Sequence, residues 1–374
     1  MKIAILTSSR ADYGIYKPLI KALNGDPFFH LTIIAFGTHL SNYHGHTIDE
    51  IEKDGFTVNY KVNSLLLTDD ENSISTSLGL TIVKFAEFWE SHWKDFDWVF
   101  CLGDRFEMFA AVTAALSYGI RFAHIHGGET TLGAIDNVFR HSISLVSKLH
   151  FVANPVFAER VKLLLGETKE GNGNIIVSGA LSLDNLDQFE LFGKEEFFSK
   201  WQIDLSIPSI LVTVHPETVI PEQNAVHLRE TIAVLIELKN QYQLIITMPN
   251  IDTYGSIYRN EFTILSEKYP DKVKLVENFG TQSYFTVMHS VKFMLGNTSS
   301  GIIEAASFNK YVINIGDRQK GRLSGENVLN VSFNKNEIIS CVRHIETLTN
   351  VQSANIYYHG GAVDKIIETL KSLF

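Results

Sequence analysis

Two apolar segments that each run into a short stretch of glycine and charged residues constrain the fold of this chain most strongly. The first covers residues 98–102 and runs into residues 103–105, and the second covers residues 121–125 and runs into residues 126–129. Apolar runs of this length predict strands that are buried on both faces. Residues 106–116 between them have a helical pattern, which predicts that the two strands lie parallel in one sheet, with their polar residues at the same edge.

Each of these strand ends carries a carboxylate, Asp104 on the first and Glu129 on the second. In open α/β sheets, ligands bind at the edge formed by the carboxyl ends of the strands. Carboxylates at such an edge suit general acid–base catalysis, because burial and mutual proximity can separate their pKa values. We therefore predict that Asp104 and Glu129 are catalytic.

Strand and helix patterns alternate over the rest of the chain in two series, which predicts an α/β protein with two doubly wound, mostly parallel sheets. The 374 residues also exceed what one ordinary core accommodates. The predicted strands are residues 2–7, 31–36, 56–62, 98–102, 121–125, 149–153, 175–177, 209–214, 243–248, 273–277, 292–295 and 311–315. The predicted helices are residues 15–23, 48–54, 76–96, 106–116, 135–147, 156–165, 223–240, 256–268, 283–290, 302–307 and 361–370. The predicted division is a first domain at 1–180, a crossing at 181–206, a second domain at 207–350 and a terminal segment at 351–374.

Composition excludes several classes of partner. The net charge is −10 and no dense block of Lys and Arg occurs, which argues against nucleic acid and against an anionic membrane surface. No apolar run is long enough to span a membrane. The two cysteines, Cys101 and Cys341, lie far apart in the sequence, so we expect reduced thiols and a cytoplasmic location.

Motifs for cofactors and for other reaction classes are missing. Residues 2–7 are not followed by a Gly-x-Gly-x-x-Gly turn, so no nicotinamide cofactor is implied. The pairs His44/His46 and His124/His126 lack a third ligand at metal-binding spacing, and we predict no metal. The chain has no Gly-x-Ser-x-Gly elbow and no P-loop lysine, which disfavours a serine hydrolase or an NTPase.

A second ligand-binding stretch is predicted at residues 296–301, a Gly-Asn-Thr-Ser-Ser-Gly turn between a strand pattern and a helix pattern. Such a turn gathers backbone N–H groups and the positive end of a helix at one point, where an anion can bind. Ser299 or Ser300 could instead simply cap the helix. We favour the ligand site, because capping does not explain three hydroxyl residues between two glycines at a strand end. Glu304, about one turn further, could accept a hydrogen bond from a ligand hydroxyl group.

Three single residues are weaker candidates, each at the end of a predicted strand. Arg10 stands where a phosphate-binding turn would lie, although an ion pair with Asp12 explains it equally well. His215 follows residues 209–214 and should reach the ligand edge, although a histidine in the core or at a helix cap is the commoner case. His39 follows the second strand.

Asp136 and Arg140 open a predicted helix at positions i and i+4. A plain ion pair within the helix explains this spacing, and it also places the acid favourably in the helix dipole. A catalytic or binding role is about equally supported at this point.

Seven of these stretches taken together resemble one family, the hydrolysing UDP-N-acetylglucosamine 2-epimerases of the branch that begins sialic acid and related nonulosonate synthesis. They run in family order over nearly the whole chain, which makes the combination far more specific than any single motif. The stretches are residues 7–14, 102–105, 124–129, 136–143, 215–218, 296–304 and 313–319. The resemblance implies the glycosyltransferase-B fold, two Rossmann-like domains facing a central cleft, with the last helix returning to the first domain. It also implies a homodimer.

The resemblance assigns roles to individual residues. It implies that Asp104, Glu129 and Asp136 are the acid–base carboxylates and that His215 contacts the substrate pyrophosphate. The predicted catalytic residues are therefore Asp104, Glu129, Asp136 and His215. The predicted substrate-binding residues are Arg10, His39, Arg105, Arg140, Asn250, Phe279, Ser299, Ser300, Gly301, Glu304 and Arg318.

The reaction expected from the resemblance is hydrolysis of UDP-N-acetylglucosamine to UDP and N-acetylmannosamine, by elimination to a glycal and addition of water, without a cofactor. The close alternative is the same reaction on UDP-2,4-diacetamido-2,4,6-trideoxyglucose, the route to legionaminic acid. Two other classes stay open. A glycosyltransferase of the same fold would turn over only with an acceptor, and a non-catalytic binding protein would leave the sugar nucleotide intact.

Overall fold

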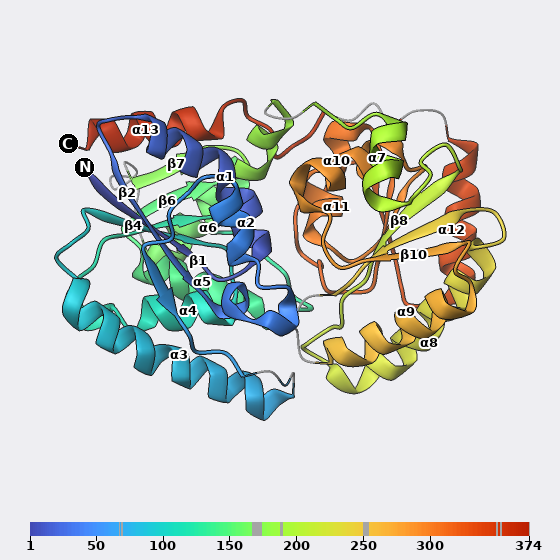
Figure 1. Ribbon diagram of the computed structural model, residues 1–374, viewed down its shortest axis with the longest axis horizontal. Coiled ribbons are helices and arrows are strands. Elements are labelled where there is room, and N and C mark those ends of the chain that lie inside the picture. Colours follow the sequence, from blue (N-terminus) through green and yellow to red (C-terminus); the bar gives the residue numbers. More distant parts are fainter. Residues whose placement is uncertain are drawn as a thin grey trace. The chain divides into compact units, whose positions relative to one another are not determined.

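The computed structural model describes residues 1–66, 68, 70–166, 174–187, 190–249, 254–348, 351 and 354–373. The chain forms two compact α/β units (Figure 1). Unit 1 comprises Met1–Glu129, Asp136–Gln188 and Tyr357–Phe374, and unit 2 comprises Thr130–Ile135 and Phe189–Ile356. The short segment Thr130–Ile135 is thus grouped with unit 2, although the residues on either side of it belong to unit 1.

Unit 1 is built on a parallel sheet in the order β3-β2-β1-β4-β5-β6-β7. Its strands are β1 (Lys2–Thr7), β2 (His30–Phe36), β3 (Tyr60–Val62), β4 (Trp98–Leu102), β5 (Phe122–Ile125), β6 (Leu149–Val152) and β7 (Ile175–Val177). Its helices are α1 (Arg10–Gly25), α2 (Ile48–Lys53), α3 (Glu71–His92), α4 (Phe106–Thr113), α5 (Asp136–Val146), α6 (Pro155–Leu165) and α13 (Ala362–Ser372). The chain builds the sheet outward from β1 in both directions, as doubly wound folds do.

Successive residues of β1 alternate between two cores because the side chains of a strand point to opposite faces. Ile3 and Ile5 pack in the core that α1 and α13 cover. Ala4 and Leu6 pack in the opposite core, under α3, α4 and α5. In Figure 1 the red helix α13 lies beside the blue helix α1, which brings the end of the chain back onto unit 1.

Unit 2 repeats this plan with a parallel sheet in the order β10-β9-β8-β11-β12-β13. Its strands are β8 (Ser209–Thr213), β9 (Gln243–Thr247), β10 (Val273–Val276), β11 (Met294–Gly296), β12 (Val312–Ile315) and β13 (Val328–Val331). Its helices are α7 (Lys194–Trp201), α8 (Asn224–Leu238), α9 (Gly255–Lys268), α10 (Gly280–Ser290), α11 (Ser299–Ile303) and α12 (Lys335–Thr347). Helices α8, α9 and α12 cover one face of the sheet, and α7 and α10 cover the other.

Two elements of unit 2 are missing from the sequence predictions, which assign nothing between residues 319 and 361. The structure has β13 and α12 there. The β13 strand is short, half-buried and at the edge of the sheet, so it lacks the apolar run that marks the central strands. The sequence of helix α12 does indicate a helix, because Asn334 is a capping residue and the apolar residues Ile338, Val342 and Ile345 follow helical spacing.

Several predicted boundaries are also wrong. Helix α1 begins at Arg10 instead of residue 15, because Ser9 caps it within the stretch expected to be a turn. Helix α3 begins at Glu71 instead of residue 76, because the Asp70 carboxylate accepts a hydrogen bond from the Ser73 backbone N–H and caps the helix. The strand expected at residues 56–62 is reduced to β3. The helix expected at residues 302–307 divides into α11, which starts at Ser299, and a 3₁₀ helix at Ala305–Phe308.

Candidate active site

The sheet order of unit 1 brings the carboxyl ends of β1, β4 and β5 together. Residues after β1 enter α1, whose first residue is Arg10. Residues after β4 include Asp104 and Arg105, and residues after β5 lead to Glu129. Since the strand order reverses direction at β1, this edge is the position where doubly wound sheets bind their ligands.

Arg140 connects the two predicted carboxylates of this edge. Its guanidinium forms an ion pair with the Asp104 carboxylate, and its Nη1 donates a hydrogen bond to the backbone oxygen of Glu129 at 3.2 Å. Arg140 is 1% exposed, and a buried guanidinium needs such a charged partner. The ion pair thus joins α5 to the turn after β4. Asp136, which the sequence offers as the partner of Arg140, is the half-buried first residue of α5.

Glu129 lies against His126. Oε1 of Glu129 is 2.7 Å from Nδ1 of His126, and both residues are buried. The two residues come from one short loop after β5, where the backbone N–H of His126 donates to the Phe151 carbonyl. Glu129 is thus held by an imidazole on its side chain and by Arg140 on its backbone.

Arg105 and His39, two predicted substrate-binding residues, already have partners in unit 1. Arg105 binds the buried Glu107 with Nη2–Oε1 at 3.0 Å and Nε–Oε2 at 3.2 Å. Burial raises the pKa of Glu107, and the Arg105 guanidinium opposes that rise. His39 is fully buried with its ring nitrogens 2.9 Å from the hydroxyls of Thr7 and Thr47, and burial lowers its pKa to about 4. Their roles in substrate binding stay predictions.

The alternative reading of Arg10, an ion pair with Asp12, does not match the partners that the Asp12 carboxylate has. Its Oδ2 accepts hydrogen bonds from the Ser8 N–H at 2.9 Å, the Ser8 hydroxyl at 2.6 Å and the Ser9 N–H at 3.1 Å. Ser9 in turn caps α1 and completes a capping box with Asp12. Arg10, half-buried at the start of the helix, stays a predicted phosphate ligand.

In unit 2, Asn297 joins the ends of three strands. Its side-chain amide exchanges hydrogen bonds with the His215 backbone, at 2.7 Å from the His215 N–H and at 2.9 Å to the His215 carbonyl. Its own carbonyl accepts from Gln319 Nε2 at 2.9 Å and from Arg318 Nη1 at 3.4 Å. The turns after β8, β11 and β12 are therefore tied together, and they carry His215, Ser299 and Arg318 at one edge of this sheet.

Glu217 fixes the turn after β12 in a similar way. Its Oε1 accepts from the backbone N–H groups of Asp317 at 2.5 Å and Arg318 at 3.0 Å, and burial raises its pKa. Asn224 holds the backbone of Glu217 through two further hydrogen bonds. Neither Asn297 nor Glu217 is a predicted site residue, although both lie inside stretches that carry the family resemblance.

The predicted anion turn lies at the end of β11. The N-cap of α11 is Thr298 and makes no side-chain capping hydrogen bond, so the capping explanation for Ser299 and Ser300 is wrong. The Ser300 hydroxyl instead lies 2.6 Å from the Tyr284 hydroxyl. Gly296 is required here, since a Cβ on it would lie 1.9 Å from the Thr213 carbonyl oxygen at a φ of +148°.

The remaining predicted residues of unit 2 are Gly301, Glu304, Phe279 and Asn250. Gly301 and Glu304 are buried in and just after α11. Phe279 is 5% exposed and packs against Phe197 and against Trp201, whose ring centroid is 4.8 Å away. Asn250 lies outside the described residues.

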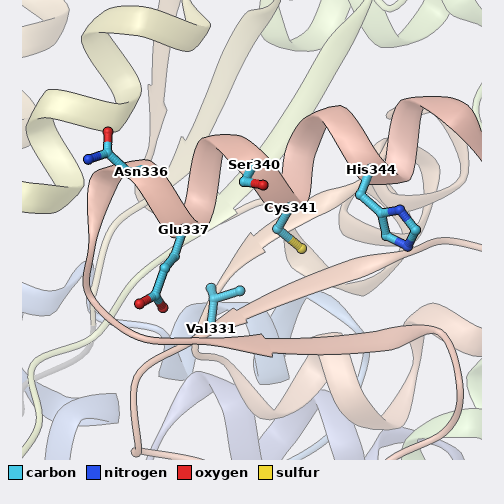
Figure 2. Close-up of a pocket in the computed structure, with 6 residues that line it drawn as sticks. All are labelled: Val331, Asn336, Glu337, Ser340, Cys341 and His344. Atoms are coloured by element: carbon cyan, nitrogen blue, oxygen red, sulfur yellow. The ribbon is translucent and has the colours of Figure 1, made fainter.

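A hollow of about 480 Å³ lies elsewhere in unit 2, where side chains of α12 project beside Val331 of β13 (Figure 2). It is lined by Val331, Asn336, Glu337, Ser340, Cys341 and His344. None of the predicted site residues lines it, so this hollow is separate from the candidate site. Within the described residues, no group of three or more His, Cys, Asp or Glu side chains is arranged to hold a metal ion. No helix in the described part of the chain combines the length and apolar character needed to cross a membrane.

Comparison with known proteins agrees with the resemblance seen in the motifs. A family profile described as UDP-N-acetylglucosamine 2-epimerase matches residues 21–371. The chain is 36% identical to the GDP/UDP-N,N'-diacetylbacillosamine 2-epimerase (hydrolyzing) of Campylobacter jejuni, over 89% of this chain and 85% of the relative. It is 32% identical to the UDP-N,N'-diacetylbacillosamine 2-epimerase (hydrolyzing) of Legionella pneumophila, over 100% of this chain and 96% of the relative. It is also 32% identical to the polysialic acid biosynthesis protein P7 of Escherichia coli, over 99% of this chain and 93% of the relative.

A solved structure supports the fold. The UDP-GlcNAc 2-epimerase from Neisseria meningitidis, bound to UDP-GlcNAc, matches with a TM-score of 0.79 at 19% identity, over 100% of each chain. At this identity the match shows the fold alone. The prediction of a glycosyltransferase-B type architecture with two Rossmann-like units is confirmed.

Proposed function

Since the chain belongs to the UDP-N-acetylglucosamine 2-epimerase family, we propose that it is a hydrolysing 2-epimerase of UDP-N,N'-diacetylbacillosamine. This sugar nucleotide is the UDP-2,4-diacetamido-2,4,6-trideoxyglucose that the sequence offers as the alternative substrate. The observation that carries the proposal is the similarity, at 36% and 32% identity over most of each chain, to two hydrolysing 2-epimerases named for that sugar.

UDP-N-acetylglucosamine, the first expectation from the motifs, becomes the second candidate. The family profile is described by that substrate, and the polysialic acid biosynthesis protein P7 is as similar to this chain as the Legionella relative is. The two candidates differ only at C4 and C6 of the sugar. The reaction at C1 and C2 is the same for both.

The reaction needs proton transfer at a carbon whose hydrogen is not acidic. A carboxylate takes the proton from C2, and the electron pair of the C2–H bond forms the C1–C2 double bond of a glycal. The C1–O bond breaks at the same time, and its electron pair leaves with UDP. Water then adds its oxygen to C1, an acid gives a proton to C2 from the opposite face, and the proton that water loses returns to a carboxylate. General acid–base steps of this kind are worth about 10²–10⁴-fold per group.

We assign the proton transfers to the edge of unit 1, through Asp104, Glu129 and Asp136. The contact between Arg140 and both strand-end turns supports this assignment, because one buried cation then holds Asp104 and the Glu129 backbone in fixed positions. Preorganised groups of this kind stabilise a transition state without reorganising during the reaction.

We assign the diphosphate to the edge of unit 2, through His215, Ser299, Ser300 and Arg318. The hydrogen bonds of Asn297 support this assignment, since they hold the His215 backbone and the Arg318 guanidinium at the turn that leads to Ser299 and Ser300. Donors and a cation in this arrangement stabilise the negative charge that develops on UDP as it leaves. A cytoplasmic homodimer is part of the same proposal.

The decisive test is proton NMR of the purified protein with each of the two sugar nucleotides in heavy water, without added cofactor. The expected products are UDP and the 2-epimeric free sugar with deuterium at C2, formed faster from UDP-N,N'-diacetylbacillosamine. Faster turnover of UDP-N-acetylglucosamine would reverse the order of the two candidates. Release of UDP without deuterium at C2 would exclude the elimination mechanism, and turnover only with an added acceptor would indicate a glycosyltransferase.

A further inference from the structure

His126 contacts one of the predicted acids, Glu129, and the proposed function gives this histidine no role. His126 and Glu129 form the pair described above, with Nδ1 and Oε1 2.7 Å apart. We propose that His126 is the positioning residue of Glu129, holding its carboxylate in one orientation and sharing the proton that Glu129 exchanges with the substrate. This inference rests on the proposed function, since it deepens the role of Glu129 in that reaction.

The backbone of His126 supports a functional reason for this residue. Its φ is +65°, in the left-handed region that favours glycine and that asparagine, aspartate and histidine enter more often than other residues. A residue with a Cβ is strained there, and such strain collects at functional sites. Here the strained backbone turns the imidazole onto the carboxylate three residues later.

The loop that carries the pair packs closely against its neighbours at its two glycines. A Cβ on Gly128 would lie 2.4 Å from the Phe157 carbonyl oxygen, and a Cβ on Gly127 would lie 3.0 Å from Nδ1 of His124. At Gly128 the loop therefore packs directly on the backbone of α6, and at Gly127 it packs on the His124 side chain of β5. This packing fixes the backbone positions from which His126 and Glu129 meet.

Comparison with His124 shows what is particular to His126. Nε2 of His124 lies 2.9 Å from the Gly103 carbonyl and Nδ1 lies 3.0 Å from the Ser144 hydroxyl, and the ring is fully buried. His126 is 7% exposed. Its Nε2 makes no hydrogen bond with any described residue and is not one of the described side-chain nitrogens that are both buried and without a partner. His126 can therefore pass a proton between solvent or ligand at Nε2 and Glu129 at Nδ1, whereas His124 has both nitrogens occupied.

The proton balance of the reaction explains what the pair contributes. In the proposed mechanism one acid must hold a proton before water adds, and must regain one afterwards. With Glu129 ionised, Nδ1–H of His126 donates to Oε1. A proton that reaches Nε2 makes the ring a cation, and the Nδ1 proton can then pass to Glu129 and from there to the substrate. The ring is then neutral with its proton on Nε2. When the proton that water loses reaches Glu129, it passes to Nδ1 as Nε2 releases its own proton, which restores the starting tautomer.

The test compares His126→Asn, His126→Ala and the wild type. Asparagine tolerates the left-handed backbone and can still donate to Glu129 near the position of Nδ1, but it cannot carry a proton. His30→Asn, at an exposed histidine at the start of β2, is the matched control. For each variant, kcat, KM, the dissociation constant of UDP and the deuterium content at C2 are measured with the sugar nucleotide that the wild type turns over faster.

The expected result for His126→Asn is a fall of about 10- to 100-fold in kcat, with KM and UDP affinity within about threefold of the wild type. Added imidazole should restore part of the kcat of His126→Ala, and His30→Asn should match the wild type. Wild-type kcat in His126→Asn, or a loss of UDP affinity equal to the loss of kcat, would overturn the inference. If the wild type itself turns over neither sugar nucleotide, the proposed function fails instead.

Discussion

The two sheets have the same plan, but their carboxyl edges have different chemistry. In unit 1 the edge carries carboxylates that face cations or imidazoles, in the pairs Asp104–Arg140 and Glu129–His126. In unit 2 it carries amides and hydroxyls around the turn after β11, with Asn297 holding the His215 backbone. One carboxylate of this edge, Glu217, accepts hydrogen bonds from two backbone N–H groups of the turn after β12, which indicates a structural role.

This difference indicates a division of labour that the fold alone does not impose. Carboxylates paired with imidazole or guanidinium suit proton exchange in unit 1. Neutral donors with an Arg and a His suit the binding of an anion in unit 2. Substitutions at the two edges should therefore change different kinetic constants.

The largest effect is expected for Glu129→Gln. Glutamine keeps an oxygen that can accept from His126 but cannot exchange protons, so kcat should fall by at least about 100-fold. UDP affinity, measured by calorimetry, should stay within about twofold, because the diphosphate is assigned to unit 2. A parallel loss of UDP affinity would contradict the division between the two edges.

Asp104→Asn should differ from Glu129→Gln in its effect on stability. Arg140 is 1% exposed, so removing the charge of Asp104 takes a charged partner away from a buried guanidinium. The free energy of unfolding of unit 1 should fall by about 3 kcal/mol, in addition to the loss of turnover. Urea denaturation of the two variants side by side tests this, and equal stability of both would show that the ion pair contributes little.

Gly296→Ala should destabilise unit 2 without any change of charge. The added Cβ would lie 1.9 Å from the Thr213 carbonyl oxygen, so β8 and β11 would have to separate. We expect a loss of about 2–3 kcal/mol in the free energy of unfolding. Gly45→Ala is the control, since its φ is also positive but nothing lies within 4 Å of an added Cβ. An equal effect of both substitutions would mean that backbone strain, and not the close approach of the strands, sets the cost.

The placement of several residues at these edges could be predicted from the sequence, because a polar residue directly after a buried strand reaches the edge of the sheet whatever the strand order. Asp104 and His215 are of this kind. The partner of Arg140 could not be predicted, because Asp104 lies 36 residues away and the contact depends on β4 and β5 pairing. The contact of Glu217 with Asp317 spans 100 residues and likewise depends on the order of strands in the sheet.

As the pH falls, unit 1 should lose stability at a higher pH than unit 2. Burial lowers the pKa of His124 to about 3 and the pKa values of His39 and His150 to about 4. In the unfolded chain histidine takes up a proton near pH 6.5, so the stabilisation by the neutral rings is complete above that pH and is lost as the pH falls toward 4. Each histidine contributes a slope of up to about 1.4 kcal/mol per pH unit.

Hydrogen exchange measured by peptide between pH 6.5 and 4.5, corrected for the intrinsic rate, tests this order. Peptides of β1, β5 and β6 should lose protection at a higher pH than peptides of β8 and β11. In unit 2 burial also lowers the pKa of His227, so some acid sensitivity is expected there. Loss of protection in both units at the same pH would contradict the prediction.

The smallest effect is expected for Ser300→Ala. Its hydroxyl is 2.6 Å from the Tyr284 hydroxyl and 3.3 Å from that of Thr298, and a single neutral hydrogen bond to a ligand contributes about 1 kcal/mol. UDP affinity should fall by about three- to fivefold with kcat unchanged. Tyr284→Phe removes only the neighbouring hydroxyl and should have a smaller effect on UDP. If Ser300→Ala lowered kcat and left UDP affinity intact, the hydroxyl would act in the chemistry, and proton handling would not be confined to unit 1.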